Sequence, residues 1–139
     1  MNKELRYHKT YLKMAQVWSS LSKSRRKKVG ALVVKNGTII SDGYNGTPSG
    51  FPNDCEDLDG NTHWYVLHAE ANAILKTSRS TQDISGSTLY LTLSPCKECS
   101  KLIIQSGIKK IFYIEDYRDQ DGIKILKAAG IEITKINDL

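Results

Sequence analysis

The chain has 139 residues, of which 40% are hydrophobic and 25% are charged, and 20 Lys and Arg against 15 Asp and Glu give a formal net charge of +5. This length suits one compact domain with a hydrophobic core that needs no disulfides, so we expect a single domain over residues 1–139. No apolar run approaches the roughly 20 residues that a membrane-spanning helix needs, so we expect no membrane contact. The first ten residues lack the apolar stretch of a signal peptide, and we expect a cytoplasmic protein.

Four consecutive cations at positions 25–28 account for most of the excess charge, because the rest of the chain contains 16 positive and 15 negative side chains. Such a cluster is typical of a nucleic-acid contact, of a phosphate-binding patch for a small nucleotide, or of a solvated turn without a function. Charge alone does not decide among the three, so the choice depends on chemistry elsewhere in the sequence.

The first third of the sequence predicts a helix and then a β-hairpin. Apolar side chains recur at steps of three and four residues, which indicates the buried stripe of a helix, and they are Tyr7, Tyr11, Met14, Ala15, Trp18 and Leu21. Two β-prone runs, 29–35 and 38–42, flank Asn36 and Gly37, the pair best suited to a two-residue hairpin turn. We therefore expect an antiparallel strand pair.

Residues 43–63 are rich in Gly, Pro, Asn and Asp, which predicts an irregular loop of about 20 residues. Loops of that length in a compact domain are usually functional or disordered. Helix and strand patterns then alternate, and they cover helix 66–78, strand 88–93, helix 95–105 capped by Gly107, strand 110–115, helix 122–129 and strand 131–136. Because strands joined through single helices pair in parallel, we expect a three-layer α/β/α fold with a mixed five-stranded sheet.

Two short motifs at predicted helix starts contain metal-binding residue types. Cys96 and Cys99 stand one helical turn apart, the spacing at which both thiols reach one zinc ion, and the helix dipole there favours thiolates. A redox pair has the same spacing, but it normally follows the first strand of a thioredoxin-like pattern, whereas this pair follows the third. His68 supplies a third ligand, which leaves the fourth position that a catalytic zinc keeps for water.

Glu70 stands two residues after His68, where it is a non-ligand carboxylate beside the expected water. An HxE motif followed by PCxxC is the pattern of zinc-dependent base deaminases. Each of these residues alone has an ordinary structural explanation, but their match in type, spacing and order favours a joint site. A purely structural zinc with Cys55 as the fourth ligand is the rival hypothesis, although nothing in the spacing of Cys55 demands coordination.

The residues around both motifs resemble the zinc-dependent cytidine deaminase superfamily, through HAEANAI at 68–74 and SPCKEC at 94–99. Further stretches resemble the deoxycytidylate (dCMP) deaminase family within it, and they are VGA at 29–31, GYNG at 43–46 with Pro48 and Gly50, and LIIQSGIK at 102–109. The similarity extends over residues 22–133, which is most of the chain. It implies a cytidine deaminase-like fold.

The resemblance also implies an activity, the hydrolytic deamination of dCMP to dUMP and ammonia, which would supply dUMP for thymidylate synthesis. Zinc (Zn2+) held by His68, Cys96 and Cys99 would activate water, which attacks carbon 4 of the cytosine ring. Glu70 would take the proton from this water, deliver it to the ring nitrogen and later protonate the departing amine.

The same resemblance implies substrate contacts. Asn45 would hydrogen-bond the deoxyribose, and backbone groups of Ala69 and Ser94 would contact the amide edge of the base. Arg26 and Tyr117 are the candidates for the 5′-phosphate, although Tyr117 is equally suited to covering the sheet edge. The basic cluster is then interpreted as phosphate recognition beside a small-molecule site.

In relatives, the GYNG segment is associated with an effector nucleotide site, where dCTP activates and dTTP inhibits, and Mg2+ can accompany the triphosphate. The resemblance thus implies effector contacts from Gly43, Tyr44, Asn45 and Gly46, although Tyr44 is also suited to a packed core position. Such enzymes commonly form hexamers, so we expect a homo-oligomer.

Some viral relatives carry a second, structural zinc, bound by a cysteine shortly before the VGA strand and by histidines in a longer central insertion. Residues 22–26 contain no cysteine here, and the insertion is short. Cys55 and His63 remain but are too few for a second site. We therefore expect one zinc ion per chain.

Two alternatives remain open. A tRNA adenosine deaminase shares HAE and PCxxC and would use the basic cluster as an RNA contact, although residues 72–74, residues 43–46 and the absence of a further basic segment weigh against it. A non-catalytic zinc module would bind nucleic acid through the same cluster. We favour the free nucleotide as substrate and expect no nucleic-acid partner.

Overall fold

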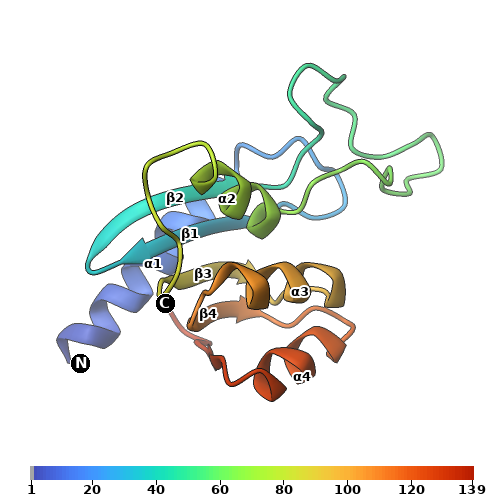
Figure 1. Cartoon of the computed structure of the whole chain (residues 1–139). Helices are drawn as coiled ribbons and strands as arrows, with labels where there is room; N and C mark the ends of the chain where they lie inside the picture. The colour runs from blue at the N-terminus through green and yellow to red at the C-terminus, as the bar shows by residue number, and fades with distance from the viewer. Residues whose placement is uncertain (1) are drawn as a thin grey trace.

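Five strands form one sheet in the order β2-β1-β3-β4-β5 in the computed structural model, which describes residues 2–139 (Figure 1). The strands are β1 (Gly30–Lys35), β2 (Thr38–Tyr44), β3 (Thr88–Leu93), β4 (Lys110–Glu115) and β5 (Glu132–Lys135). β1 is antiparallel to both β2 and β3, whereas β3, β4 and β5 run parallel. Asn36 and Gly37 form the predicted turn, with φ values of 51° and 74°. The mixed five-stranded sheet is therefore confirmed.

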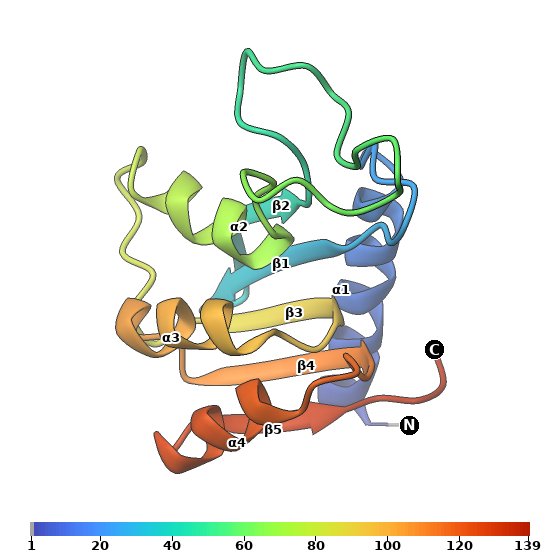
Figure 2. The ribbon, with the colours of Figure 1, turned by 90° about the vertical axis from the view of Figure 1, so that its right-hand side faces the viewer.

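Helices cover both faces of this sheet (Figure 2). α1 (Lys3–Ser19) lies on one face, and the other face carries α2 (Ala69–Thr77), α3 (Lys97–Ser106) and α4 (Asp121–Ala128). Side chains of the central strands alternate between the two faces. Leu32 and Tyr90 pack with Leu12 of α1 in one core. Val33 and Leu91 belong to the larger core on the other face, which confirms the three layers.

The face that α1 buries differs from the stripe that the sequence predicts. Leu12 and Ala15 are buried, but three residues of the predicted stripe are exposed, and they are Tyr7, Met14 and Leu21. The true stripe is displaced because it includes a polar residue, His8. The Nδ1 atom of His8 lies 2.7 Å from the hydroxyl of Tyr90, so a hydrogen bond satisfies the ring against the sheet.

α2 begins at Ala69, three residues later than the sequence predicts. The Leu67 N–H donates a hydrogen bond to the Gly46 carbonyl at 2.8 Å, and these residues form an isolated antiparallel bridge. This bridge keeps the chain extended up to His68, which is the N-cap of α2. β2 in turn continues to Tyr44, beyond its predicted end at residue 42.

Two glycines let the helices that carry the motifs lie close to their neighbours. A Cβ atom on Gly43 of β2 would lie 2.4 Å from the carbonyl oxygen of Ala69, at the start of α2. A Cβ atom on Gly122 of α4 would lie 2.4 Å from the carbonyl oxygen of Pro95, just before α3. The starts of α2 and α3 are therefore seated against backbone, with no room for a side chain.

A long segment without regular structure joins β2 to α2 and projects from one end of the sheet (Figure 1). The predicted loop lies within it, although the first two predicted loop residues belong to β2. Glu56 and Thr62 form an isolated bridge inside the segment. Of the helices formed by residues 2–139, none is long and apolar enough to span a membrane.

Candidate metal centre and catalytic cavity

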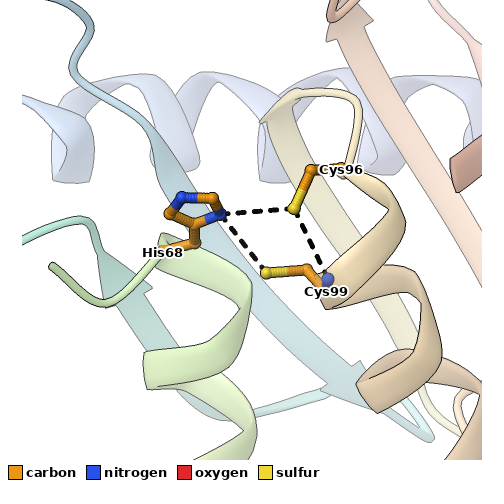
Figure 3. Close-up of side chains that lie close together, drawn as sticks. All are labelled: His68, Cys96 and Cys99. Carbon is orange, nitrogen blue, oxygen red and sulfur yellow. Dashed lines mark hydrogen bonds between the residues drawn. The ribbon is translucent and has the colours of Figure 1, made fainter. Parts of the chain in front are cut away.

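The N-termini of α2 and α3 bring three metal-binding side chains together (Figure 3). His68 is the N-cap of α2, Cys96 is the N-cap of α3, and Cys99 lies in the first turn of α3. The Nδ1 atom of His68 lies 3.5 Å from Cys96 Sγ and 3.3 Å from Cys99 Sγ. All three ligand atoms lie within 4.8 Å of one another, and residues 2–139 contain no other cluster of this kind.

The chemistry of this donor set suits Zn2+. One imidazole nitrogen and two sulfurs are the protein ligands of one type of catalytic zinc site, which keeps its fourth position for water. The hydrogen bond from Cys99 lowers the pKa of Cys96 to about 4. The hydrogen bond to Cys96, together with burial, raises the pKa of Cys99. A bound dication would favour the thiolate form of both sulfurs.

Glu70 lies in the first turn of α2, and only 4% of the residue is exposed. Burial raises the pKa of Glu70 to about 7, although the hydrogen bond to its own backbone N–H and the nearby His68 act in the opposite direction. A carboxyl group with a pKa near neutrality is suited to accept a proton in one step and return it in the next.

His68, Glu70 and Cys96 border a cavity of about 510 Å³, a volume typical of small-molecule sites. Apolar side chains in its lining are Val29, Val66 and Leu93. Charged side chains in the same lining are Arg26, Lys27, Glu115, Asp116 and Arg118. A ligand that has both a planar ring and an anionic group suits this combination.

All of the predicted substrate contacts line this cavity. These residues are Arg26, Asn45, Ala69, Ser94 and Tyr117. The Asn45 side chain is bonded at both ends, because Oδ1 accepts a hydrogen bond from the Val29 N–H at 2.8 Å and Nδ2 donates to the Lys27 carbonyl at 2.8 Å. The Ser94 hydroxyl accepts a hydrogen bond from the Tyr117 N–H at 2.7 Å. Both side chains therefore also hold the cavity wall in shape.

Several charged residues of the cavity are not among the predicted substrate contacts, although Lys27 belongs to the basic cluster that the sequence assigns to phosphate recognition. Lys27 Nζ forms an ion pair with Glu115 Oε2 at 2.7 Å, which joins the segment before β1 to the end of β4. The guanidinium of Arg118 lies over the ring of Tyr117, 5.6 Å from its centroid. The sequence contains a signal for Glu115 and Arg118, because the run EDYR at 115–118 begins at the carboxyl end of the parallel strand β4, where α/β sheets bind ligands.

The GYNG segment borders two cavities rather than one. Asn45 lines the first, whereas the other three residues line a second cavity of about 510 Å³, and they are Gly43, Tyr44 and Gly46. Lys76 and Arg79 of the α2 region also line the second cavity. Tyr44 is 36% exposed, so it does not occupy a packed core position.

Cys55, the fourth ligand in the rival structural-zinc hypothesis, is buried but does not belong to the metal-binding cluster. His63 does not belong to it either, and the backbone N–H of His63 donates to the Cys55 carbonyl at 2.8 Å. Among residues 2–139, no fourth His, Cys, Asp or Glu therefore joins the three ligand candidates.

A three-layer α/β fold that joins a His-Cys-Cys cluster to a buried glutamate defines the class of zinc-dependent nucleobase deaminases. Within that class, the chain belongs to the cytidine and deoxycytidylate deaminase family. Residues 5–115 match the model of this family, described as the cytidine and deoxycytidylate deaminase zinc-binding region. The family predicted by resemblance is thus confirmed.

Named relatives are similar over most of the chain. The sequence is 38% identical to the deoxycytidylate deaminase of Enterobacteria phage T4, over 91% of this chain and 88% of that protein. It is 36% identical to the deoxycytidylate deaminase of Homo sapiens, over 84% of this chain and 70% of that protein. The fold is similar to a crystal structure of dCMP deaminase from the cyanophage S-TIM5 in complex with dCMP and dUMP, with a TM-score of 0.92, 49% identity, and coverage of 98% of this chain and 99% of that chain.

Proposed function

We propose that this chain is a cytoplasmic, single-domain enzyme that hydrolyses dCMP to dUMP and ammonia and so supplies dUMP for thymidylate synthesis. One observation carries the proposal: a buried Glu70 borders the same nucleotide-sized cavity as the metal-binding cluster. The relatives described above support dCMP as the substrate. All three cysteines are free, which suits a reducing compartment.

The chemistry divides between a metal ion and Glu70. His68, Cys96 and Cys99 would hold Zn2+, which supplies the Lewis acidity that makes water nucleophilic near neutral pH. Glu70 accepts one proton as water adds to carbon 4 of the ring, and it delivers that proton to the ring nitrogen. It then transfers the second proton of the water to the amino group. The carbon–nitrogen bond breaks, ammonia leaves, and the ring keeps the oxygen as a carbonyl.

Three residues orient the base and the sugar. Ala69 is the first residue of α2, and its N–H has no acceptor within the helix, so it can donate to the cytosine carbonyl. The Ser94 N–H is donated to the Glu115 carbonyl at 2.8 Å, so the Ser94 carbonyl is the backbone group that contacts the amino group of the base. Asn45 keeps a second amide hydrogen beyond the one donated to the Lys27 carbonyl, and this hydrogen is donated to the deoxyribose.

The 5′-phosphate is bound by Arg26 together with Tyr117. Arg26 lines the cavity and forms no ion pair within residues 2–139, whereas the neighbouring Lys27 is paired with Glu115. A planar guanidinium donates two parallel hydrogen bonds to a phosphate, which a lysine does not. Arg118, stacked on Tyr117, adds a second guanidinium to the same cavity.

The second cavity is our proposed effector site, where dCTP activates and dTTP inhibits, with Mg2+ accompanying the triphosphate. Arg79 supplies a cation there, which supports an anionic ligand, whereas Lys76 lines the cavity but is paired with Asp42. α2 has nine residues and borders both cavities. Asn72 of this helix donates a hydrogen bond to the Tyr44 carbonyl at 2.8 Å. A ligand that moves α2 would therefore change both sites, in a homo-oligomer that we propose to be a hexamer.

Ammonia release tests the activity. We expect release from dCMP and none from a tRNA anticodon hairpin, whereas the reverse result would identify a tRNA adenosine deaminase. A zinc protein that releases ammonia from neither would be the non-catalytic module.

Regulation is tested by measuring the reaction rate against dCMP concentration. A sigmoidal curve that dCTP makes hyperbolic supports regulation, and a hyperbolic curve that dCTP does not change contradicts it. Sedimentation velocity measures the oligomer.

A further inference from the structure

We propose that Glu56 is a positioning residue, whose carboxylate holds the backbone of residues 24–26 so that Arg26 presents its guanidinium to the 5′-phosphate of the substrate. The proposal rests on the proposed function for the identity of that substrate. Glu56 lies in the long segment between β2 and α2 and does not itself line the cavity. Its effect is therefore exerted through the basic cluster.

The Glu56 carboxylate is surrounded by donors from one short stretch of chain. It accepts hydrogen bonds from the Ser24 hydroxyl at 2.7 Å, from the Arg25 N–H at 3.1 Å and from the Arg26 N–H at 3.2 Å. Arg25 Nε adds an ion pair at 3.5 Å. Consecutive backbone N–H groups that converge in this way form an anion-binding concavity, and here a carboxylate of the same chain fills it.

The anchor is buried and charged. The Glu56 side chain is 1% exposed, and burial acts to raise its pKa. Hydrogen bonds from Ser24, Arg25 and Arg26 outweigh burial, so the pKa of Glu56 lies below its usual value. The donors therefore face an ionised carboxylate, and hydrogen bonds to an ionised partner are roughly twice as strong as neutral ones.

The basic cluster depends on such anchors because no helix or strand includes it. It lies between the end of α1 at Ser19 and the start of β1 at Gly30. Glu56 fixes the first half of this connection, and Asn45 fixes the second half through its bonds to the Lys27 carbonyl and the Val29 N–H. Arg26 stands between the two anchors.

The four cations of the basic cluster differ in their contacts, and this difference separates their roles. Arg25 is paired with Glu56, and Lys27 is paired with Glu115. Lys28 does not line the cavity. Arg26 lines the cavity, and its own N–H is bonded to Glu56, so its backbone is fixed where its charge is available.

Steady-state kinetics of Glu56→Gln with dCMP test the proposal. Glutamine has nearly the same shape but loses the charge and places an N–H donor against the backbone donors. We expect the KM for dCMP to rise about tenfold, since charge-assisted hydrogen bonds are lost, while kcat and the zinc content stay near those of the wild type. The matched control is Glu132→Gln, which removes an exposed carboxylate of β5, and it should change neither constant.

Product inhibition separates positioning from general damage. We expect inhibition by dUMP to weaken with the KM, whereas inhibition by deoxyuridine, which has no phosphate, stays unchanged. In an Arg26→Ala background, Glu56→Gln should add no further rise in KM, because both changes remove the same phosphate contact. An unchanged KM, an equal loss for dUMP and deoxyuridine, or additive effects would each overturn the proposal.

Ser24→Ala keeps the proposal testable if Glu56→Gln does not fold. It removes one hydrogen bond from the carboxylate and the longer one that the Lys27 N–H donates to the same hydroxyl, and it leaves the charge in place. Ser24 also lines the cavity, so the expected rise in KM of about threefold, with normal zinc content, must disappear in an Arg26→Ala background. A KM equal to that of the wild type would contradict the role of Glu56. Wild-type protein that releases no ammonia from dCMP would instead contradict the proposed function, so the two failures are distinguishable.

Discussion

Asn45 Oδ1 accepts a hydrogen bond from the backbone N–H of Val29 at 2.8 Å, which ties the end of β2 to the start of β1. Replacing Asn45 by Ala leaves the buried N–H of Val29 and the part-buried carbonyl of Lys27 without these partners. We expect Asn45→Ala to lower the free energy of unfolding by about 2 kcal/mol, because a buried unpaired group keeps its desolvation cost. Urea unfolding followed by tryptophan fluorescence measures the change.

The control for this variant is Asn137→Ala, because Asn137 is exposed near the end of the chain. Surface changes of this kind usually stay within about 0.5 kcal/mol. If the two variants lose stability equally, the bonds of Asn45 do not contribute as the geometry indicates.

Glu70→Gln tests the proton-transfer role. The variant keeps the size of the side chain and leaves His68, Cys96 and Cys99 intact, so the zinc content should stay at one ion per chain. We expect kcat for dCMP to fall at least about 100-fold, the usual contribution of a positioned acid–base group. Metal analysis and ammonia release on the same preparation measure both quantities. A Glu70→Gln enzyme with nearly the wild-type rate would refute the mechanism.

Substitution of single cysteines distinguishes a zinc site formed by the His-Cys-Cys cluster from the rival structural zinc site. Cys99→Ser should lose most of the zinc, because hydroxyl oxygen is a weaker ligand than thiolate, and ammonia release should disappear. Cys55→Ala should keep one zinc ion per chain and most of the activity, since Cys55 lies outside the cluster. Zinc loss from Cys55→Ala would instead revive the structural-zinc hypothesis.

The metal cluster could be predicted from the sequence because its residues lie in two local motifs at helix starts. His68 precedes α2, and Cys96 and Cys99 begin α3. Short-range spacing on a helix fixes which side chains of one motif share a direction. The known pairing of HxE with PCxxC then joins the two motifs across 28 positions. The order of helices and strands followed from hydrophobic periodicity in the same local way.

The cavity rim could not be predicted because its contacts are distant in sequence. Glu56 bonds residues 24–26 across some thirty positions, and Lys27 pairs with Glu115 across 88 positions. No periodicity connects such residues. The prediction of which α1 residues are buried was wrong for a different reason. His8 lies on the core face of α1, and the partner that satisfies its ring nitrogen is the hydroxyl of Tyr90 in β3.

Stability against pH tests the charge of Glu56. Burial opposes ionisation of Glu56, but the hydrogen bonds from Ser24, Arg25 and Arg26 outweigh it and hold the pKa below its usual value. A depressed folded-state pKa stabilises the protein above the unfolded-state pKa, and the contribution is lost as the pH falls through the folded-state value. We therefore expect the stability difference between wild type and Glu56→Gln to be largest near neutral pH.

The same difference should shrink below about pH 4, where the unfolded carboxyl has become protonated and the folded one follows. Urea midpoints measured between pH 7 and pH 3 give the profile. A difference that stays constant over this range would mean that the shape of Glu56, and not its charge, holds the basic cluster.

Gly43→Ala tests whether the close contact between β2 and α2 seats the metal centre. The new Cβ atom would lie 2.4 Å from the Ala69 carbonyl oxygen, so the start of α2, and His68 with it, must move. We expect the free energy of unfolding to fall by about 2 kcal/mol and zinc affinity to fall with it. Gly46→Ala is the control, because its nearest contact would be a Tyr44 ring carbon at 4.0 Å. Full zinc retention by Gly43→Ala at wild-type stability would show that the backbone contact does not position His68.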